Sequence, residues 1–235
     1  DYPLRAVELA ALEAGADDLF AENGFYSFSD PIFKATFLRF AEALARGHIV
    51  LSDLYSNTQV MTGEVLSGIG SSAAILYYND TVTYEDGTSE PMQLTVLPLP
   101  HVAGKQPRIT QAGVGLCAYK TTSQKAEAAA VFVKWLTEPQ RNLDFACEAG
   151  YMPVTNGAFD EIDVHTFRSD AYRALYTALK AATADAAVVS EQQSPDYYSR
   201  VYAFYDMLRT EQKSFGADRD AAATAADLWR RLGGT

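Results

Sequence analysis

The stretch from Ala112 to Phe159 decides the fold, and it reads AGVGLCAYKTTSQKAEAAAVFVKWLTEPQRNLDFACEAGYMPVTNGAF. Its first part, residues 114–119, has the composition of a strand. Behind it, apolar side chains recur at the spacing of one buried helix face: Ala126, Ala129, Ala130, Val133 and Leu136. A strand followed by an amphipathic helix is typical of an α/β fold.

A second, shorter helix is predicted directly after the first. Thr137 offers a side-chain oxygen for its N-terminus, with Gln140 three residues on, as in a capping box. Gly150 supplies the expected stop, and the chain leaves as Tyr151-Met152-Pro153. The order of strand, long helix, short helix and Gly-Tyr-x-Pro exit is more specific than any one of these features.

The rest of the chain predicts further helices with few strands. Strands are expected at residues 69–77 and 93–97, with a tight turn at Asp86-Gly87 between them. Helices are expected at residues 4–15, from Asp30-Pro31 to Gly47, near residues 58–66, at 167–184, from Ser194-Pro195 onward and at 218–232. The predicted core includes Phe37, Phe40, Val133, Leu136, Phe204 and Trp229.

Composition restricts the classes of function. The chain has 235 residues, enough for one large domain or two small ones, and a net charge of −11. A strongly acidic protein repels phosphate backbones, so nucleic acid is not an expected partner. No apolar run approaches the roughly 20 residues that span a bilayer, so this segment is not expected to insert into a membrane. No signal peptide opens the sequence.

The chemistry-bearing residues form no metal or cofactor motif. Three scattered histidines, His48, His101 and His165, and two cysteines give no ligand spacing, and no cofactor is expected. Cys117 and Cys147 are interpreted as small buried apolar residues, with a disulfide left open. The glycine-rich run before Ser71 and Ser72 lacks the lysine of a phosphate loop.

The stretch 112–159, together with residues 60–72 and Pro98-Leu99-Pro100, resembles the extracellular solute-binding proteins of ABC importers. The resemblance is to the large group that includes maltose-, oligosaccharide- and glycerol-phosphate-binding members. It implies a periplasmic-binding-protein-like α/β fold of type II, no enzymatic activity, a small-molecule solute such as a carbohydrate, and ABC permease subunits as partners. It further implies an extracytoplasmic location, in the periplasm or as a cell-surface lipoprotein.

The resemblance also nominates ligand contacts. Ser71 and Ser72 follow the family's pattern at a turn that lines the cleft, although the tryptophan often found there is missing. Tyr151 occupies the exit loop, and Tyr198 lies in the first turn after Ser194-Pro195, where family members present an aromatic ring. Tyr197 fits the apolar stripe and is expected in the core.

The resemblance covers roughly residues 25–235 and matches the C-terminal half of the family. We therefore expect residues 1–235 to form the C-terminal portion of a two-lobed protein, with residues 98–157 containing the segment that crosses to the first lobe. Two alternatives stay open: a hydrolase or transferase that uses a serine such as Ser71, and a scaffold domain without a ligand.

Overall fold

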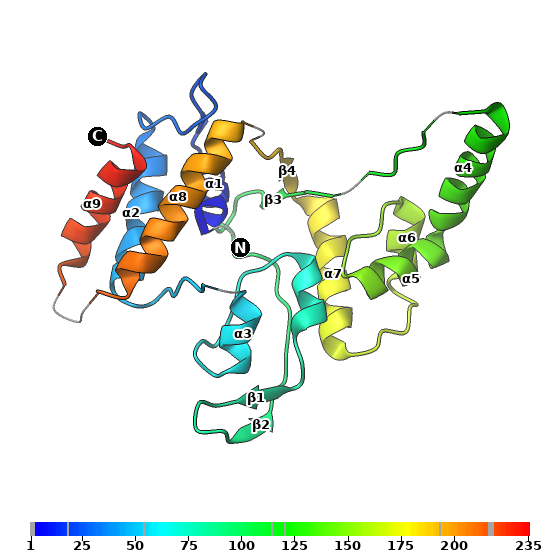
Figure 1. The fold of residues 1–235 in the computed structure, drawn as a ribbon, viewed down its shortest axis with the longest axis horizontal. Helices are drawn as coiled ribbons and strands as arrows, with labels where there is room; N and C mark the ends of the chain where they lie inside the picture. Colours follow the sequence, from blue (N-terminus) through cyan, green and yellow to red (C-terminus); the bar gives the residue numbers. More distant parts are fainter. Residues whose placement is uncertain are drawn as a thin grey trace. The chain divides into compact units, whose positions relative to one another are not determined.

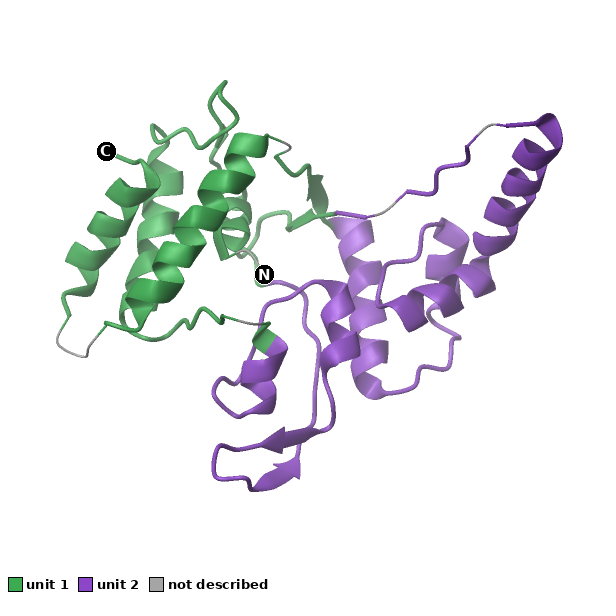
Figure 2. Ribbon diagram, viewed as in Figure 1, with its two compact units in different colours: residues 1–56, 100–111, 186–235 green, residues 57–99, 112–185 purple. Residues whose placement is uncertain are grey.

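The computed structural model describes residues 3–17, 19–53, 55–113, 115–119, 121–192, 194–215 and 219–235 (Figure 1). The chain divides into two compact units, each assembled from separate segments (Figure 2). Unit 1 comprises Asp1–Ser56, Pro100–Gln111 and Ala186–Thr235, and unit 2 comprises Asn57–Leu99 and Ala112–Asp185.

The described part of unit 1 contains four helices: α1 (Pro3–Ala14), α2 (Pro31–Ala45), α8 (Pro195–Gln212) and α9 (Ala221–Leu232). The predicted start of α2 is confirmed. Asp30 accepts hydrogen bonds from the backbone N–H groups of Ile32 and Phe33 at 2.7 and 3.0 Å, and Pro31 takes the first helical position, where its missing N–H costs nothing. The start predicted for α9 at Asp218 lies outside the described residues.

An aromatic core joins the helices of unit 1. The ring of Phe37 on α2 lies 6.1 Å from that of Phe204 on α8 and 5.3 Å from that of Trp229 on α9. All three side chains are buried, as the sequence predicted. Phe40 is half-buried at the edge of the same cluster. Apolar burial of this kind is the main source of stability in a helical unit.

Unit 2 holds the other described helices: α3 (Ser56–Met61, entering from unit 1), the 3₁₀ helix η1 (Ser72–Tyr77), α4 (Ser123–Leu136), α5 (Pro139–Ala149), α6 (Asn156–Glu161) and α7 (Asp170–Asp185). Its core lies among η1, α5, α6 and α7, where Leu143, Ala146 and Tyr176 are almost fully enclosed.

The strands are short and pair in twos. β1 (Thr81–Thr83) and β2 (Ser89–Pro91) form an antiparallel hairpin around the predicted Asp86-Gly87 turn, where Gly87 has φ 83°. β3 (Arg108–Thr110) and β4 (Ala187–Val189) pair in parallel within unit 1. Both members of this second pair lie a few residues from positions where the chain passes from one unit to the other.

The three strands predicted from the sequence are not formed in the described residues. Residues 72–77 are a 3₁₀ helix, and residues 93–97 and 115–119 carry no strand. Val114 lies outside the described residues. A strand exists only when its backbone groups pair with a neighbour, and a β-forming composition does not by itself provide that neighbour. The run 115–119 is therefore strand-like sequence without a sheet.

The long helix predicted behind residue 122 is present as α4, but its environment differs from the prediction. Thr122 is its N-cap and accepts from the backbone N–H of Lys125 at 3.2 Å. Thr137 caps the C-terminus of α4 instead of starting α5, because Pro139 takes the first position of α5 and Glu138 precedes it. None of the α4 residues is buried.

The burial predicted for α4 was wrong at Val133, which is 37% exposed, and incomplete at Leu136, which is half-buried. Cys117 in the preceding segment is also exposed, against prediction, and Cys147 on α5 is half-buried. Both cysteines are free thiols. The apolar pattern of residues 115–119 and 121–136 is present, yet none of these residues is buried.

Candidate functional site

Ser71 and Ser72 lie at the start of η1 instead of at a strand entry. Ser71 is the N-cap residue, with an extended backbone at φ −70° and ψ 165°, and its side chain makes no capping hydrogen bond. The side chain of Ser71 is exposed, and that of Ser72 is half-buried. The hydroxyl of Ser71 is therefore accessible to a solute from the solvent.

Tyr151 follows a helix end that packs on η1. Gly150 closes α5 in the left-handed conformation at φ 69°, and a Cβ atom there would lie 2.8 Å from the Cα of Ala73. Only glycine allows this approach without displacing the backbone of η1. The side chain of Tyr151 is 49% exposed. Unit 2 thus brings the two serines and Tyr151 to adjoining segments.

Two residues that the sequence analysis did not single out hold the loop after α5. The hydroxyl of Tyr176 lies 2.6 Å from the carbonyl oxygen of Ala146 and 3.0 Å from that of Tyr151. Burial raises the pKa of Tyr176, so its hydroxyl stays protonated and can donate. The buried Asn142 accepts from the backbone N–H of Val154 at 2.8 Å. The backbone around Tyr151 is fixed even though its ring is exposed.

Tyr198 lies in unit 1, near the start of α8. Its ring is half-buried, packs edge-on against Tyr197 at 5.4 Å and stacks with Tyr202 at 6.5 Å and 29° between planes. Its hydroxyl lies 3.4 Å from a carboxylate oxygen of Glu191. Desolvation, and then the nearby Glu191 charge, raise the pKa of Tyr198. Tyr198 and Tyr202 are neighbouring aromatic rings one helical turn apart.

Tyr197, next to Tyr198, is buried as predicted, and it makes polar contacts in the core as well as apolar ones. Its hydroxyl donates to the Glu8 carboxylate at 2.6 Å, and that of Tyr26 donates to the same oxygen at 2.5 Å. The guanidinium of Arg5 contacts the other oxygen of Glu8 at 2.7 Å and lies 3.7 Å from Glu191. This network is a polar centre inside unit 1.

The Glu8 network could have been suspected from the sequence. Glu8 stands between Val7 and Ala11 on the apolar stripe of α1 and is only 2% exposed. A carboxylate at such a position must be compensated by hydrogen bonds or a counterion. Burial raises the pKa of Glu8, against the opposing effects of Arg5 and the two tyrosine hydroxyls.

A cysteine, a histidine and an aspartate lie next to one another in unit 2, with the histidine between the other two. The Sγ atom of Cys147 is 3.8 Å from Nε2 of His165, and Nδ1 of His165 is 3.7 Å from a carboxylate oxygen of Asp144. Burial raises the pKa of Cys147 to about 11, so the thiol keeps its proton near neutral pH. A protonated thiol is a poor nucleophile, and the arrangement does not support cysteine catalysis.

The hydrolase alternative receives no support from Ser71 either. Among the hydrogen bonds of the described residues, none joins the Ser71 hydroxyl to a histidine. A serine nucleophile needs such a base within about 2.6–3.2 Å. The described part of the chain also contains no group of three or more His, Cys, Asp or Glu that could hold a metal ion. No described helix is long and apolar enough to cross a membrane.

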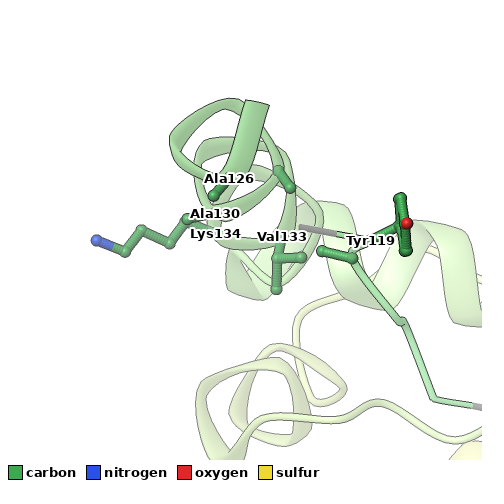
Figure 3. Close-up of a pocket in the computed structure, with 7 residues that line it drawn as sticks. Tyr119, Ala126, Ala130, Val133 and Lys134 are labelled. Carbon is green, nitrogen blue, oxygen red and sulfur yellow. The ribbon is translucent and has the colours of Figure 1, made fainter. Parts of the chain in front are cut away.

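A hollow lies along α4, as Figure 3 shows. It has a volume of about 420 Å³, and its lining is almost wholly apolar. One wall is Ala118 and Tyr119, and the other comes from α4. The residues of the α4 wall are Ala126, Ala129, Ala130, Val133 and Lys134. With no convergent polar groups other than Lys134, this hollow is unlike a site for a polar solute.

Residues 10–174 match the family of bacterial extracellular solute-binding proteins. The chain belongs to this family. No curated protein matches it. Among solved structures, the crystal structure of a cyclic α-maltosyl-1,6-maltose-binding protein from Arthrobacter globiformis is similar, with a TM-score of 0.51 and 17% identity. The likeness covers 96% of this chain and 54% of the solved chain, so the solute-binding chain described here spans about half the length of that protein.

The comparisons confirm two expectations drawn from the sequence. The resemblance to solute-binding proteins was correct, and the helix-rich α/β fold is that of part of a periplasmic-binding protein. The four nominated ligand residues divide between the units, with Ser71, Ser72 and Tyr151 in unit 2 and Tyr198 in unit 1. Their convergence on one surface stays a prediction.

Proposed function

We propose that this protein captures a small solute, of the sugar class, outside the cytoplasm and delivers it to the permease of an ABC importer. The observation that carries the proposal is the family match over residues 10–174. The similar fold of a maltosyl-maltose-binding protein favours a carbohydrate over other solutes. The action is binding and release, without covalent chemistry.

The proposed mechanism is closure of a cleft around the solute. Two bodies joined by a few chain crossings can close by changes at those crossings, and a solute that binds the closed form better shifts the population toward it. The chain described here passes between its two units at four positions, after Ser56, Leu99, Gln111 and Asp185. Recognition of the closed form by the permease would then couple binding to transport.

We assign the solute contacts to Ser71, Ser72, Tyr151 and Tyr198. The serine hydroxyls can exchange hydrogen bonds with sugar hydroxyls, and the tyrosine rings can stack on the C–H faces of a pyranose. Two observations support the choice: the serines and Tyr151 lie on adjoining segments, and Tyr198 lies beside a second ring, Tyr202.

We also propose that residues 1–235 are the C-terminal portion of a two-lobed protein, and that residues 98–157 include the segment that crosses to the first lobe. Support comes from the length comparison, since the chain spans 54% of the solved binding protein. A cell-surface or periplasmic location, including anchoring as a lipoprotein, belongs to the same proposal.

A thermal-shift panel on the complete polypeptide tests the function. The panel contains maltose, cyclic maltosyl-maltose, other oligosaccharides, and amino acids as a contrasting class. A sugar at 100 times its Kd should add about 2.7 kcal/mol to the free energy of unfolding. Stabilisation by an amino acid alone would refute the sugar assignment. If no compound of the panel stabilises the protein, the proposal that it captures a solute of these classes is refuted.

Variants of the complete polypeptide test the assigned residues. Tyr198→Ala and Tyr151→Ala should each weaken the binding of the responding sugar by removing a stacking surface. Tyr55→Ala is the matched control, because Tyr55 is a highly exposed tyrosine with no assigned role. Equal affinities in all three variants would show that the site has been placed wrongly.

A further inference from the structure

Three charged side chains of unit 1 form a row that runs from the core towards the surface. The guanidinium of Arg5 contacts the carboxylate of Glu8 at 2.7 Å, and its other terminal nitrogen lies 3.7 Å from a carboxylate oxygen of Glu191. The exposed fraction of the side chain rises along this row, from 3% at Glu8 through 11% at Arg5 to 25% at Glu191. One positive charge therefore serves two carboxylates of unequal exposure.

The outer end of the row reaches a residue that we assign to the solute site. The hydroxyl of Tyr198 lies 3.4 Å from Oε2 of Glu191, whereas Arg5 approaches Oε1 of the same carboxylate. The two contacts are both longer than an ideal hydrogen bond. A shift of the Glu191 carboxylate that shortens its contact with Arg5 should therefore lengthen its contact with Tyr198.

The groups that face Glu8 at the buried end of the row come from three parts of unit 1. The titratable and charged ones among the described residues are Arg5 from α1, Tyr26 from the segment before α2, Tyr197 and Tyr205 from α8, and Glu191, through Arg5, from the segment before α8. Burial raises the pKa of each of the three tyrosines, so their hydroxyls keep their protons. The carboxyls are therefore the groups of this cluster that change charge between acidic and neutral pH.

Uptake of a proton by Glu8 changes the surroundings of Arg5. Burial raises the pKa of Glu8, so this step falls at higher pH than the protonation of exposed carboxyls. Arg5 then keeps Glu191 as its carboxylate partner, and a charge-assisted contact of this kind closes to about 2.7–2.9 Å. The Nε atom of Arg5 is buried and has no hydrogen-bond partner among the described residues, so the guanidinium has donor capacity to spare.

We propose that Arg5 and Glu191 are positioning residues that link the buried Glu8 carboxyl to Tyr198, so that uptake of a proton by Glu8 weakens the binding of solute. With Glu8 ionised, Glu191 stays within reach of the Tyr198 hydroxyl and holds the ring in its orientation. With Glu8 neutral, Arg5 draws Glu191 inwards and the Tyr198 hydroxyl loses this partner. A ring that is no longer held must be ordered again when solute binds, which lowers the affinity. The inference rests on the proposed function, which assigns Tyr198 as a solute contact.

Solute affinity as a function of pH tests this link. Calorimetry on the complete polypeptide uses the sugar that responds in the thermal-shift panel. As pH falls through the titration of Glu8, the Kd should rise several-fold before exposed carboxyls titrate. Because binding and protonation are linked, saturating sugar should in turn shift the titration of the Glu8 carboxyl carbon, followed by NMR, to lower pH. A Kd that stays constant while Glu8 titrates would overturn the proposal.

Two variants distinguish positioning from support of the fold. Glu8→Gln should show the weak, low-pH affinity throughout this pH window. Glu191→Gln should also make the affinity independent of pH there, because it removes the carboxylate that Arg5 attracts. Glu42→Gln is the matched control, since it breaks an exposed pair with Arg46 in the same unit and should keep the wild-type profile. A wild-type profile in Glu191→Gln would overturn the link, and this result does not depend on the stability of Glu8→Gln.

A measurement without sugar separates this inference from the proposed function. The NMR signals of the Tyr198 ring, assigned with Tyr198→Phe, should move with the same midpoint as the Glu8 carboxyl carbon, and in Glu191→Gln they should stay in place. If the two sets of signals move together and no sugar binds, only the proposed function is refuted. If a sugar binds and the Tyr198 signals do not follow Glu8, only the link is refuted.

Discussion

Helix α2 in unit 1 and helix α4 in unit 2 have similar lengths and similar apolar periodicity, but opposite environments. Phe33, Phe37 and Ala41 on α2 are fully enclosed by α1, α8 and α9. On α4, by contrast, no side chain is buried. A stripe of apolar residues indicates that a helix has a face to bury. It does not indicate that the element that covers this face lies within the same stretch of chain.

The difference has an energetic meaning. The apolar residues of α2 already contribute their burial to the stability of this chain, while those of α4 do so only when a partner covers them. Mutations at equivalent positions of α2 and α4 should therefore change the free energy of unfolding by unequal amounts. The size of this inequality measures how differently the two helices are packed.

The largest difference is expected for phenylalanine. Phe37→Ala removes a fully buried ring from between Phe204 and Trp229 and should lower the free energy of unfolding by about 3–5 kcal/mol. Phe132→Ala on α4 is the matched change at a half-exposed ring and should stay within about 1 kcal/mol. Urea titration measures both, and equal losses would abolish the distinction.

The polar centre of unit 1 should give the next effect. Glu8→Gln leaves the Arg5 guanidinium without its buried counterion and disturbs the hydrogen bonds from Tyr26 and Tyr197, which should cost about 1–3 kcal/mol. The exposed pair at the start of α5 serves as the control, since Glu138→Gln breaks only a solvent-screened contact with Arg141.

The same residue predicts a pH dependence. Burial raises the pKa of Glu8, so between its unfolded and native pKa values the native state holds a proton that the unfolded state has lost. The contribution of this carboxyl is therefore full below the unfolded pKa and declines as pH rises through the native pKa. Stability curves of the wild type and Glu8→Gln against pH should diverge in that window, and parallel curves would contradict the assignment.

Helix caps offer a smaller contrast. Asp30→Ala removes the acceptor for two backbone N–H groups of α2 and should lower global stability by about 0.5–2 kcal/mol. Thr122→Ala removes the equivalent cap of α4. It should reduce helicity locally by circular dichroism while the global unfolding midpoint stays in place. A shift of the midpoint by both variants would show that α4 unfolds together with the core.

The smallest effect on stability is expected at Val133, where the sequence alone predicts a large effect. Val133 fits the apolar stripe of α4, so a charge there would be costly in a packed core. In the structure its side chain is partly exposed, and Val133→Asp should change the unfolding free energy of this chain by no more than about 0.5 kcal/mol. A loss of several kcal/mol would mean that α4 is packed in solution.

Local chemistry explains what the sequence predicted correctly. Asp30-Pro31 starts α2, Gly150 ends α5, and Asp86-Gly87 turns the hairpin, because each of these depends on residues adjacent in the chain. The aromatic stripes of α2 and α8 were also found, since their partner helices lie within the same 235 residues.

The errors concern features decided by distant parts of the molecule. Residues 115–119 have strand-like composition without a neighbouring strand among the described residues, and residues 72–77 form a 3₁₀ helix whose contact with Gly150 no local pattern reveals. Thr137 was assigned to the wrong helix, because the start of α5 is governed by Pro139. The sequence analysis also missed Asn142 and Tyr176, whose hydrogen bonds hold the loop around Tyr151, because these contacts join residues from different elements.

Hydrogen exchange tests the contrast between the two helices most directly. In the 235-residue chain, the backbone amides in the middle of α2 should exchange only through global unfolding, because the helix is enclosed on its apolar face. The amides of α4 should exchange through local opening at far lower free energy, because none of its side chains is buried. Protection of α4 equal to that of α2 would contradict the account, since it would show that the apolar surface is already covered within this chain.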